Sequence, residues 1–141
     1  MKRFKFSNFN EFRPYVRVEG IVYKTPEHLY QSRKTLNIKE RNVVAGAGSP
    51  GIAKQIGKHV QLRGNWNEIK LDVMRRVQEI RFDQPYWEKQ LLESTDLVSI
   101  VEYNWWHDNY WGACLCDHCR SLEKLNHLGK IIQEIKKRKE N

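Results

Sequence analysis

The sequence predicts an α+β fold, mostly helical with a small sheet, in a single compact domain over residues 1–141. Three observations support this. A chain of 141 residues has room for one hydrophobic core and no second domain. Helical periodicity recurs along the chain, whereas segments of strand composition are few and short. No internal repeat, low-complexity run or Ser/Pro-rich linker divides the chain.

The first half of the chain is predicted to begin with two short strands and to continue with helices. β-Branched and aromatic residues in 15–23 surround Gly20 and indicate two strands joined by a tight turn. Thr25 is suited to cap a helix that starts with proline and runs over residues 26–35. A second short helix, also started by proline, is predicted over residues 50–56, where the next glycine ends it.

The second half is predicted to hold the clearest helix, residues 65–81, followed by a helix over 85–93. A buried strand is predicted over 97–103, and a last helix ends in a basic helical tail at about 130–141. The first helix carries an apolar face predicted to lie in the core, formed by Trp66, Ile69, Val73, Val77 and Ile80. In the second helix the residues predicted to face inward are Trp87, Leu91 and Leu92.

The charge of the chain is unevenly distributed. Lys and Arg number 25 against 17 Asp and Glu, for a net charge of +8 at pH 7. Residues 1–41 carry 10 basic and 4 acidic side chains, and residues 130–141 carry 5 and 2, whereas residues 94–129 carry 2 and 5. The basic excess favours a phosphate-bearing or nucleic-acid partner. It is concentrated at the two ends of the sequence and is not spread evenly along the chain.

Composition excludes several classes of protein. The chain is 40% hydrophobic with five Trp, six Tyr and five Phe, which is too apolar for disorder. A mean hydropathy of -0.76, and the lack of any run of about 18 apolar residues, predict no membrane partner. The N-terminus lacks the apolar stretch of a signal peptide, and the few cysteines do not resemble a disulfide framework, so we expect the cytoplasm. The composition does not indicate whether the protein is a monomer or an oligomer.

A polar stripe lies on the helix predicted over residues 26–35. Glu27, Gln31 and Lys34 are four and three residues apart and so share one face. Spacing alone favours an ordinary solvated helix face, with Glu27 complementing the helix dipole. A polar surface that binds substrate is the alternative.

An aromatic segment, residues 104–112, is predicted between a strand and a helix. It contains three tryptophans together with His107 and Asp108, whereas loops favour small polar residues. Aromatic rings stack on bases, and a carboxylate beside them can act on the sugar. Two interpretations stay open: a nucleotide-binding loop, or core-anchoring tryptophans with Asp108 as a turn former.

Three cysteines, Cys114, Cys116 and Cys119, lie close together in the sequence. A structural zinc site there would need a fourth ligand, for which the candidates are His107, His118 and His127. No second paired motif is present, so free reduced cysteines are favoured over zinc, and no cofactor is predicted to be required. The glycine-containing residues 44–51 lack a Gly-Lys-Ser/Thr ending and are interpreted as a turn.

Several strings together resemble one known family. Two are specific in their spacing, Glu27-His28-x-Tyr30-Gln31-x-x-Lys34 and Trp106-His107-Asp108-x-x-Trp111-Gly112. Shorter matches in the same order include Phe6-Ser7-Asn8-Phe9, Ser49-Pro50, Arg81-Phe82 and Asn126-x-Leu128-Gly129, so that the resemblance covers nearly the whole chain. On these strings the sequence resembles the NADAR domain family, which includes the YbiA-type N-glycosidases.

The resemblance implies an α+β domain that hydrolyses the N-glycosidic bond between a phosphorylated ribose and a nitrogen. The implied substrate is ADP-ribose on guanine, in DNA or RNA or as a nucleotide, or else a phosphorylated ribosyl metabolite of early riboflavin biosynthesis. A non-catalytic module that binds ADP-ribose is the third alternative. One departure is Ile132-Gln133-x-x-Lys136, where the family commonly reads Leu-Met-x-x-Arg.

The resemblance also implies that the polar stripe and the aromatic segment form one pocket. The implied catalytic residues are Glu27, Lys34 and Asp108. The implied substrate-binding residues are Asn8, Tyr30, Gln31, Trp106, Trp111 and Gly112.

The reaction suggests how these residues could share the work. Departure of the base gives an oxocarbenium-like transition state, which one carboxylate can stabilise while another group protonates the leaving nitrogen. We expect Glu27 and Asp108 to share these tasks, in either order, and Lys34 to be able to trap an opened ribose as a Schiff base. Trp106 or Trp111 would stack on the base. The candidates for holding phosphate are Arg33, Lys54 and Arg13.

Overall fold

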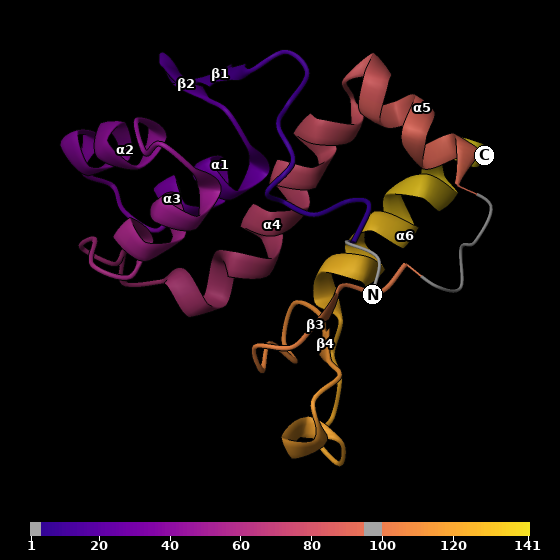
Figure 1. Ribbon diagram of the computed structural model, residues 1–141. Helices are drawn as coiled ribbons and strands as arrows, with labels where there is room; N and C mark the ends of the chain where they lie inside the picture. The colour runs from indigo at the N-terminus through magenta and orange to yellow at the C-terminus, as the bar shows by residue number, and fades with distance from the viewer. Residues whose placement is uncertain (1–3, 95–99) are drawn as a thin grey trace. The chain divides into compact units, whose positions relative to one another are not determined.

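A computed structural model describes residues 4–94 and 100–141. Within these ranges the chain forms six α-helices and two pairs of short strands, which confirms the predicted α+β class (Figure 1). The chain divides into a larger unit, residues 8–87, and a smaller unit that combines residues 1–7 with 88–141. The single domain predicted over the whole chain stays a prediction.

The larger unit begins with the predicted hairpin. Strands β1 (Val16–Val18) and β2 (Ile21–Tyr23) pair antiparallel, with Val18 opposite Ile21. The two turn residues, Glu19 and Gly20, both have positive φ, 49° and 82°. This is the backbone twist that two-residue hairpins require, and glycine adopts it without strain.

Helices α1 (Pro26–Ser32) and α3 (Pro50–Gly57) confirm the two helices predicted from proline and capping signals. The side chain of Thr25 accepts a hydrogen bond from His28 N, and that of Ser49 caps α3 in the same way. Helix α1 ends three residues before the predicted end. The amides of residues 33–35 bond three residues back instead of four, so the helix tightens after its second turn.

Helix α2 (Ile38–Ala45) was not predicted. Its apolar side chains do not share a face, because Ile38 and Val43 are exposed while Val44 is buried. It is held partly by polar contacts: the buried Arg41 donates to Thr35 O at 2.8 Å and pairs with Glu19 at 2.8 Å. Helix α1 packs against α2, α3 and α4, so it is the centre of this unit (Figure 1).

Helix α4 (Trp66–Phe82) confirms the longest predicted helix, but its buried face differs from the predicted one. Trp66 and Val77 are buried as expected, whereas the other three apolar positions are only half-buried. The polar Gln78 and Arg81 are fully buried in their place. The helix therefore turns a face with hydrogen-bonded polar side chains, and not its most apolar face, toward the core.

Helix α5 (Pro85–Glu93) has the predicted bounds. Trp87 and Leu91 are buried as predicted, but Leu92 is 40% exposed, so its inward orientation was wrong. The indole Nε1 of Trp87 donates to Glu11 O at 3.0 Å, which satisfies the polar atom of this buried ring.

The smaller unit contains a two-residue parallel pair, β3 (Tyr103–Asn104) with β4 (Ala113–Cys114), followed by the 3-10 helix η2 (Asp117–Cys119) and by α6 (His127–Glu140). The strand predicted over 97–103 was wrong in extent: residues 97–99 lie outside the described residues, and 100–102 are not in a strand. The buried face of α6 includes Leu128, Ile131, Ile132 and Ile135.

The basic tail predicted at about 130–141 is helical, and Lys139 in it pairs with Glu88 at 3.1 Å. Among the helices of residues 4–94 and 100–141, none has the length and apolar character needed to cross a bilayer.

Candidate active site

The polar stripe of α1 is not a solvated helix face. Glu27 is 8% exposed and Gln31 is 3% exposed. Gln31 Nε2 donates to Glu27 Oε1 at 2.8 Å, and Glu27 N donates to Asn8 O at 3.0 Å. A buried carboxylate is retained only where it is hydrogen-bonded, and this one is held in one orientation by the next turn of its own helix.

The opposite side of Gln31 contacts α3 at Gly57. A β-carbon at Gly57 would overlap the side-chain amide of Gln31. Among the described residues none donates a hydrogen bond to Gln31 Oε1, which is buried. The close approach of α1 and α3 therefore depends on glycine at this position and fixes the side chain that orients Glu27.

Lys34 follows α1 and lies in a group of basic side chains. Burial lowers the pKa of Lys34 most; the negative charge of Glu27 raises it, and the positive charges of Lys54, Lys58 and Lys70 lower it further. A lowered pKa increases the fraction of neutral amine, the form that attacks a carbonyl or anomeric carbon. Lys58 and Lys70 were not predicted to lie here, because Lys58 follows the end of α3 and Lys70 lies in α4.

Asn8 lies at the centre of a buried polar network. Its Oδ1 accepts hydrogen bonds from Gln78 Nε2 at 2.7 Å and from Arg81 Nη2 at 3.1 Å, and its Nδ2 lies 3.4 Å from Met74 Sδ. Arg81 is fully buried and also bonds Gln78. This network fixes the backbone of Asn8, whose carbonyl receives Glu27 N. Substrate binding by the Asn8 side chain stays a prediction.

Tyr30 and His28 lie in the core of the same unit. Tyr30 is 5% exposed, and its ring packs against Trp66 with centroids 5.4 Å apart. His28 Nε2 donates to Ala47 O at 3.0 Å, so its Nδ1 accepts from the hydroxyl of Thr25 at 2.8 Å. Both side chains hold α1 in place, and contact of Tyr30 with substrate stays a prediction.

In the smaller unit, Asn104 and Asp108 shape the aromatic segment. Asn104 Nδ2 donates to Asp108 O at 2.7 Å, while its Oδ1 accepts from the amides of Trp106 and Asp108. Asp108 Oδ1 accepts from Tyr110 N at 3.0 Å and Trp111 N at 2.9 Å. Asp108 is thus a turn former. That role uses one carboxylate oxygen, and within the described part of the chain no donor contacts Oδ2.

The aromatic side chains of this segment have two different environments. Trp106 is 60% exposed, which excludes a core role for it. Trp111 is half-buried against Tyr110, with ring centroids 4.8 Å apart, and Tyr110 packs on His127 at 4.6 Å. Of the two rings predicted to stack on a base, Trp106 is therefore exposed to solvent, and Trp111 is packed against Tyr110.

Gly112, predicted to bind substrate, is buried where two backbone segments meet. A β-carbon there would overlap the carbonyl of Glu102, which accepts a hydrogen bond from Ala113 N at 2.8 Å. This close approach explains the glycine without a ligand.

The residues able to hold a metal are the three cysteines together with His107. Their ligand atoms all lie within 4.8 Å of one another. Although burial alone raises the pKa of Cys114, hydrogen bonds from Cys116 and from the His107 amide bring it down to about 6. The cysteine group is chemically unlike three isolated buried thiols.

The predicted phosphate ligands do not lie together. Arg33 Nη2 donates to the Tyr23 hydroxyl at 3.0 Å and faces Glu19, away from the polar stripe. The guanidinium of Arg13 lies over the ring of Tyr86, 4.0 Å from its centroid. Of the three candidates, Lys54 alone accompanies Lys34.

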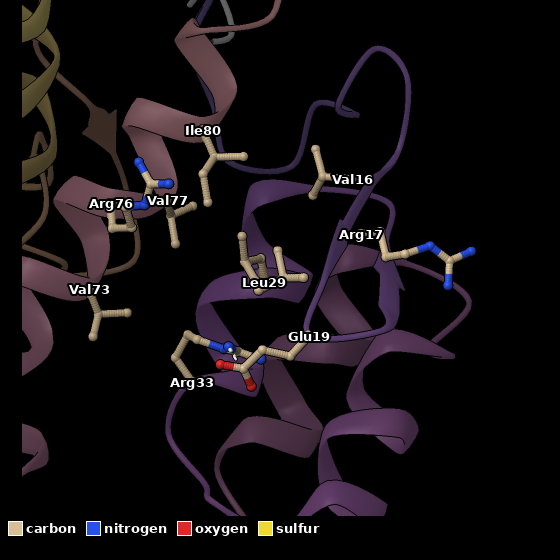
Figure 2. Close-up of a pocket in the computed structure, with 10 residues that line it drawn as sticks. Val16, Arg17, Glu19, Leu29, Arg33, Val73, Arg76, Val77 and Ile80 are labelled. Atoms are coloured by element: carbon tan, nitrogen blue, oxygen red, sulfur yellow. Dashed lines mark ion pairs between the residues drawn. The ribbon is translucent and has the colours of Figure 1, made fainter.

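A cavity of about 540 Å³ lies on the other face of α1 (Figure 2). Leu29, Val77 and Ile80 point toward one another in it, and the ion pair between Arg33 and Glu19 stands at its edge (Figure 2). None of Glu27, Gln31 and Lys34 lines this cavity. It is a groove between the hairpin, α1 and α4, and it contains no pair of carboxylates suited to glycoside chemistry.

Several known proteins are similar to this chain along nearly its whole length. N-glycosidase YbiA of Shigella flexneri serotype 5b (strain 8401) is 34% identical over 133 residues, which are 93% of this chain and 78% of that protein. The riboflavin biosynthesis protein PYRR of Zea mays is 30% identical over 147 residues, covering 93% of this chain and 22% of that protein. The NMR structure of E. coli YbiA matches 96% of this chain and 77% of its own, with a TM-score of 0.75 and 29% identity.

These similarities define the class of the protein. It is a hydrolase acting on N-glycosyl compounds, the enzyme class predicted from the sequence. The chain belongs to the NADAR domain family, whose match covers residues 2–139.

Proposed function

We propose that this N-glycosidase removes ADP-ribose from guanine, in DNA or RNA or as a nucleotide, in the cytoplasm. One observation carries the proposal: the buried carboxylate of Glu27 lies close enough to Lys34 to raise the pKa of that lysine by its charge, and Lys54, Lys58 and Lys70 gather around the same lysine. A diphosphate needs several cations, and a group of lysines supplies them as point charges. The carboxylate supplies the opposite charge, which the sugar ring needs as the bond breaks.

The reaction breaks the bond between C1 of the ribose and the guanine nitrogen. The leaving nitrogen takes a proton, the hydroxyl group of water adds to C1, and the second proton of that water passes to a base. Glu27 is suited to this chemistry because Gln31 holds one of its oxygens at 2.8 Å. Asp108 is proposed as the second carboxylate, oriented by the amides of Tyr110 and Trp111.

Lys34 offers a covalent route to the same products. Its neutral amine would form a bond to C1 while the bond from C1 to guanine breaks and the guanine nitrogen takes a proton from the general acid. Opening of the ribose ring would then transfer one amine proton to O4 and leave a protonated imine at C1. Water would add to the imine and release the sugar with the free amine. The lowered pKa of Lys34 favours the neutral amine that this route requires.

A second candidate substrate is an early intermediate of riboflavin biosynthesis. The Zea mays relative, named as a riboflavin biosynthesis protein, favours this candidate. Such a substrate also carries a phosphorylated ribose, so the same carboxylate and lysines would serve. A non-catalytic module that binds ADP-ribose would bind the same ligand without turnover.

Product identification separates these candidates. The full chain is incubated with ADP-ribosylated DNA and, separately, with the phosphorylated riboflavin intermediates, and the products are identified by mass spectrometry. We expect release of free ADP-ribose from the DNA. Release of ribose phosphate from the small intermediates alone would select the second candidate, and binding of ADP-ribose with no product from either would select the binding module.

The role of Glu27 is tested with Glu27→Gln. This variant keeps the oxygen that accepts from Gln31 and loses the titratable group, so we expect a rate loss of about 100-fold or more in a folded chain. Glu68→Gln, on the exposed first turn of α4, is the matched control and should retain the wild-type rate. Wild-type turnover by Glu27→Gln would contradict the proposed chemistry.

The covalent route is tested with borohydride. Reduction in the presence of substrate should add the mass of the sugar to the wild-type chain, but not to Lys34→Arg, which keeps the charge and lacks the nucleophile. The control is Lys39→Arg, at an exposed position of α2. Full turnover by Lys34→Arg without an adduct in the wild type would assign the reaction to direct attack by water.

A further inference from the structure

We propose that His107, Cys114, Cys116 and Cys119 form a structural zinc site in the smaller unit. The thiol sulphurs of the three cysteines surround one ring nitrogen, His107 Nδ1, at 3.2 Å for Cys119, 3.3 Å for Cys116 and 3.8 Å for Cys114. All four ligand atoms lie within 4.8 Å of one another. No other group of three or more such side chains is found in residues 4–94 and 100–141.

The separations match those of a tetrahedral zinc complex. With Zn–S bonds of about 2.3 Å and Zn–N bonds of about 2.0–2.1 Å, a tetrahedron places sulphur about 3.6 Å from nitrogen. The three measured separations lie on both sides of this value, so an ion can occupy the centre with small side-chain shifts. Three thiolates and one imidazole are a donor set that selects zinc over the harder divalent cations.

The backbone presents these four residues from the aromatic segment, from the end of β4 and from η2. Cys114 ends β4, Cys116 immediately precedes η2, and Cys119 is the last residue of η2, where its amide donates to Cys116 O at 3.2 Å. His107 has a positive φ of 69°, which returns its side chain toward the cysteines, and its amide donates to Cys114 Sγ at 3.3 Å. Non-glycine residues adopt this conformation at a cost, and such strain concentrates at functional sites.

The structure also selects among the three histidines that could complete the site. His118 is exposed, and its ring meets the edge of the His107 ring at a centroid separation of 5.7 Å. His127 packs against Tyr110 instead. His107 is therefore the fourth ligand, although His118 lies between two of the cysteines in sequence.

A closed set of four protein ligands indicates a structural ion rather than a catalytic one. The first ligand in the sequence is His107 and the second is Cys114. The ion would therefore join the two ends of the loop between them, which carries Asp108 and Trp111. Asn109 Oδ1 already bridges this loop by accepting from Cys114 N at 2.8 Å. Zinc would hold the same loop at its two ends, which makes His107 a positioning residue for Asp108.

The first experiment needs no substitution. The full chain, expressed with added zinc and purified under reducing conditions without a histidine tag, is measured by elemental analysis and X-ray absorption at the zinc edge. We expect one zinc per chain, with three sulphurs at about 2.3 Å and one nitrogen at about 2.0–2.1 Å. A folded chain free of zinc, or a shell dominated by oxygen or by several nitrogens, would overturn the proposal.

The second experiment assigns the nitrogen ligand. His107→Ala should lose the bound zinc, whereas His118→Ala should keep one zinc per chain. If His107→Ala fails to fold, exchange of cobalt into the wild type and into His118→Ala provides the same information, because both should show the visible spectrum of a tetrahedral thiolate site. Loss of zinc from His118→Ala, or full retention by a folded His107→Ala, would contradict the assignment.

Discussion

The two segments that carry the predicted chemistry are held in different ways. In the larger unit, Glu27 and Gln31 lie on a helix that is capped, packed on three other helices and pressed against Gly57. In the smaller unit, Asp108 lies in a loop without regular structure, held by the side chain of Asn104 and by its own contacts with two amides. A carboxylate can therefore be fixed by core packing, as Glu27 is, or by a few local hydrogen bonds, as Asp108 is. The loop that carries Asp108 is held by fewer contacts than the helix that carries Glu27.

Among the variants that compare the two segments here, Asp108→Asn is expected to have the largest effect, and that effect is on activity. Asparagine keeps the oxygen that accepts from Tyr110 N and Trp111 N but removes the charge, so the loop should stay folded while the rate falls about 100-fold or more. Thermal unfolding and product release are measured on the same sample. Asp72→Asn, exposed on α4, is the control. An active Asp108→Asn would leave Asp108 only as a turn former.

Gly112→Ala tests how the loop segment tolerates a close backbone contact. Its β-carbon would meet the carbonyl of Glu102, a backbone atom that cannot turn aside, so we expect the free energy of unfolding to fall by about 3 kcal/mol. Urea denaturation measures this loss. Gly64→Ala, where a β-carbon meets no atom within 4 Å, should change it little. Equal effects in the two variants would show that the Glu102 contact carries no cost.

Gly57→Ala makes the corresponding test in the helical region. Here the new β-carbon would meet the side chain of Gln31, which can shift, so we expect a smaller loss of about 2 kcal/mol. The loss should shrink when Gln31→Ala is combined with it, because the obstructing amide is then gone. A cost that is the same with and without Gln31 would contradict the proposed contact.

The smallest effect is expected for the pH dependence set by His28. Burial lowers the pKa of His28 most, and the charge of Lys24 adds to this, against the hydrogen bond to Ala47 O. The unfolded chain, whose histidine pKa is about 6.5, then binds the proton more readily. The stabilisation is therefore complete above about pH 6.5 and is lost as pH falls toward the folded value.

Urea denaturation at about pH 7.5 and about pH 5.5 measures this dependence, on either side of the ordinary histidine pKa. His28→Gln should show a shallower slope of stability against pH than the wild type. His59→Gln, at an exposed position, should keep the wild-type slope. If the slope of stability against pH is unchanged in His28→Gln, His28 is not the source of the pH dependence.

Local signals in the sequence were enough for the elements they control. Proline marked the starts of α1 and α3, the hydroxyl of Thr25 added a cap before α1, and the turn at Gly20 marked the hairpin. Helix α2 lacked such a pattern because its buried contacts include Arg41, whose partner Glu19 lies in the hairpin turn. The strand predicted up to residue 103 shrank because β3 pairs with β4 over only two residues.

By itself the sequence determined the fold class, the enzyme class and the four-residue spacing that puts Glu27 and Gln31 on one face of α1. These depend on helical periodicity and on motif order, which are properties of neighbouring residues. Only the tertiary structure decided that this face is buried, and that His107 rather than His118 joins the cysteines. The burial of Glu27 and Gln31 depends on contacts between segments far apart in the chain, and the ligand geometry depends on the backbone angle at His107; no local pattern encodes either.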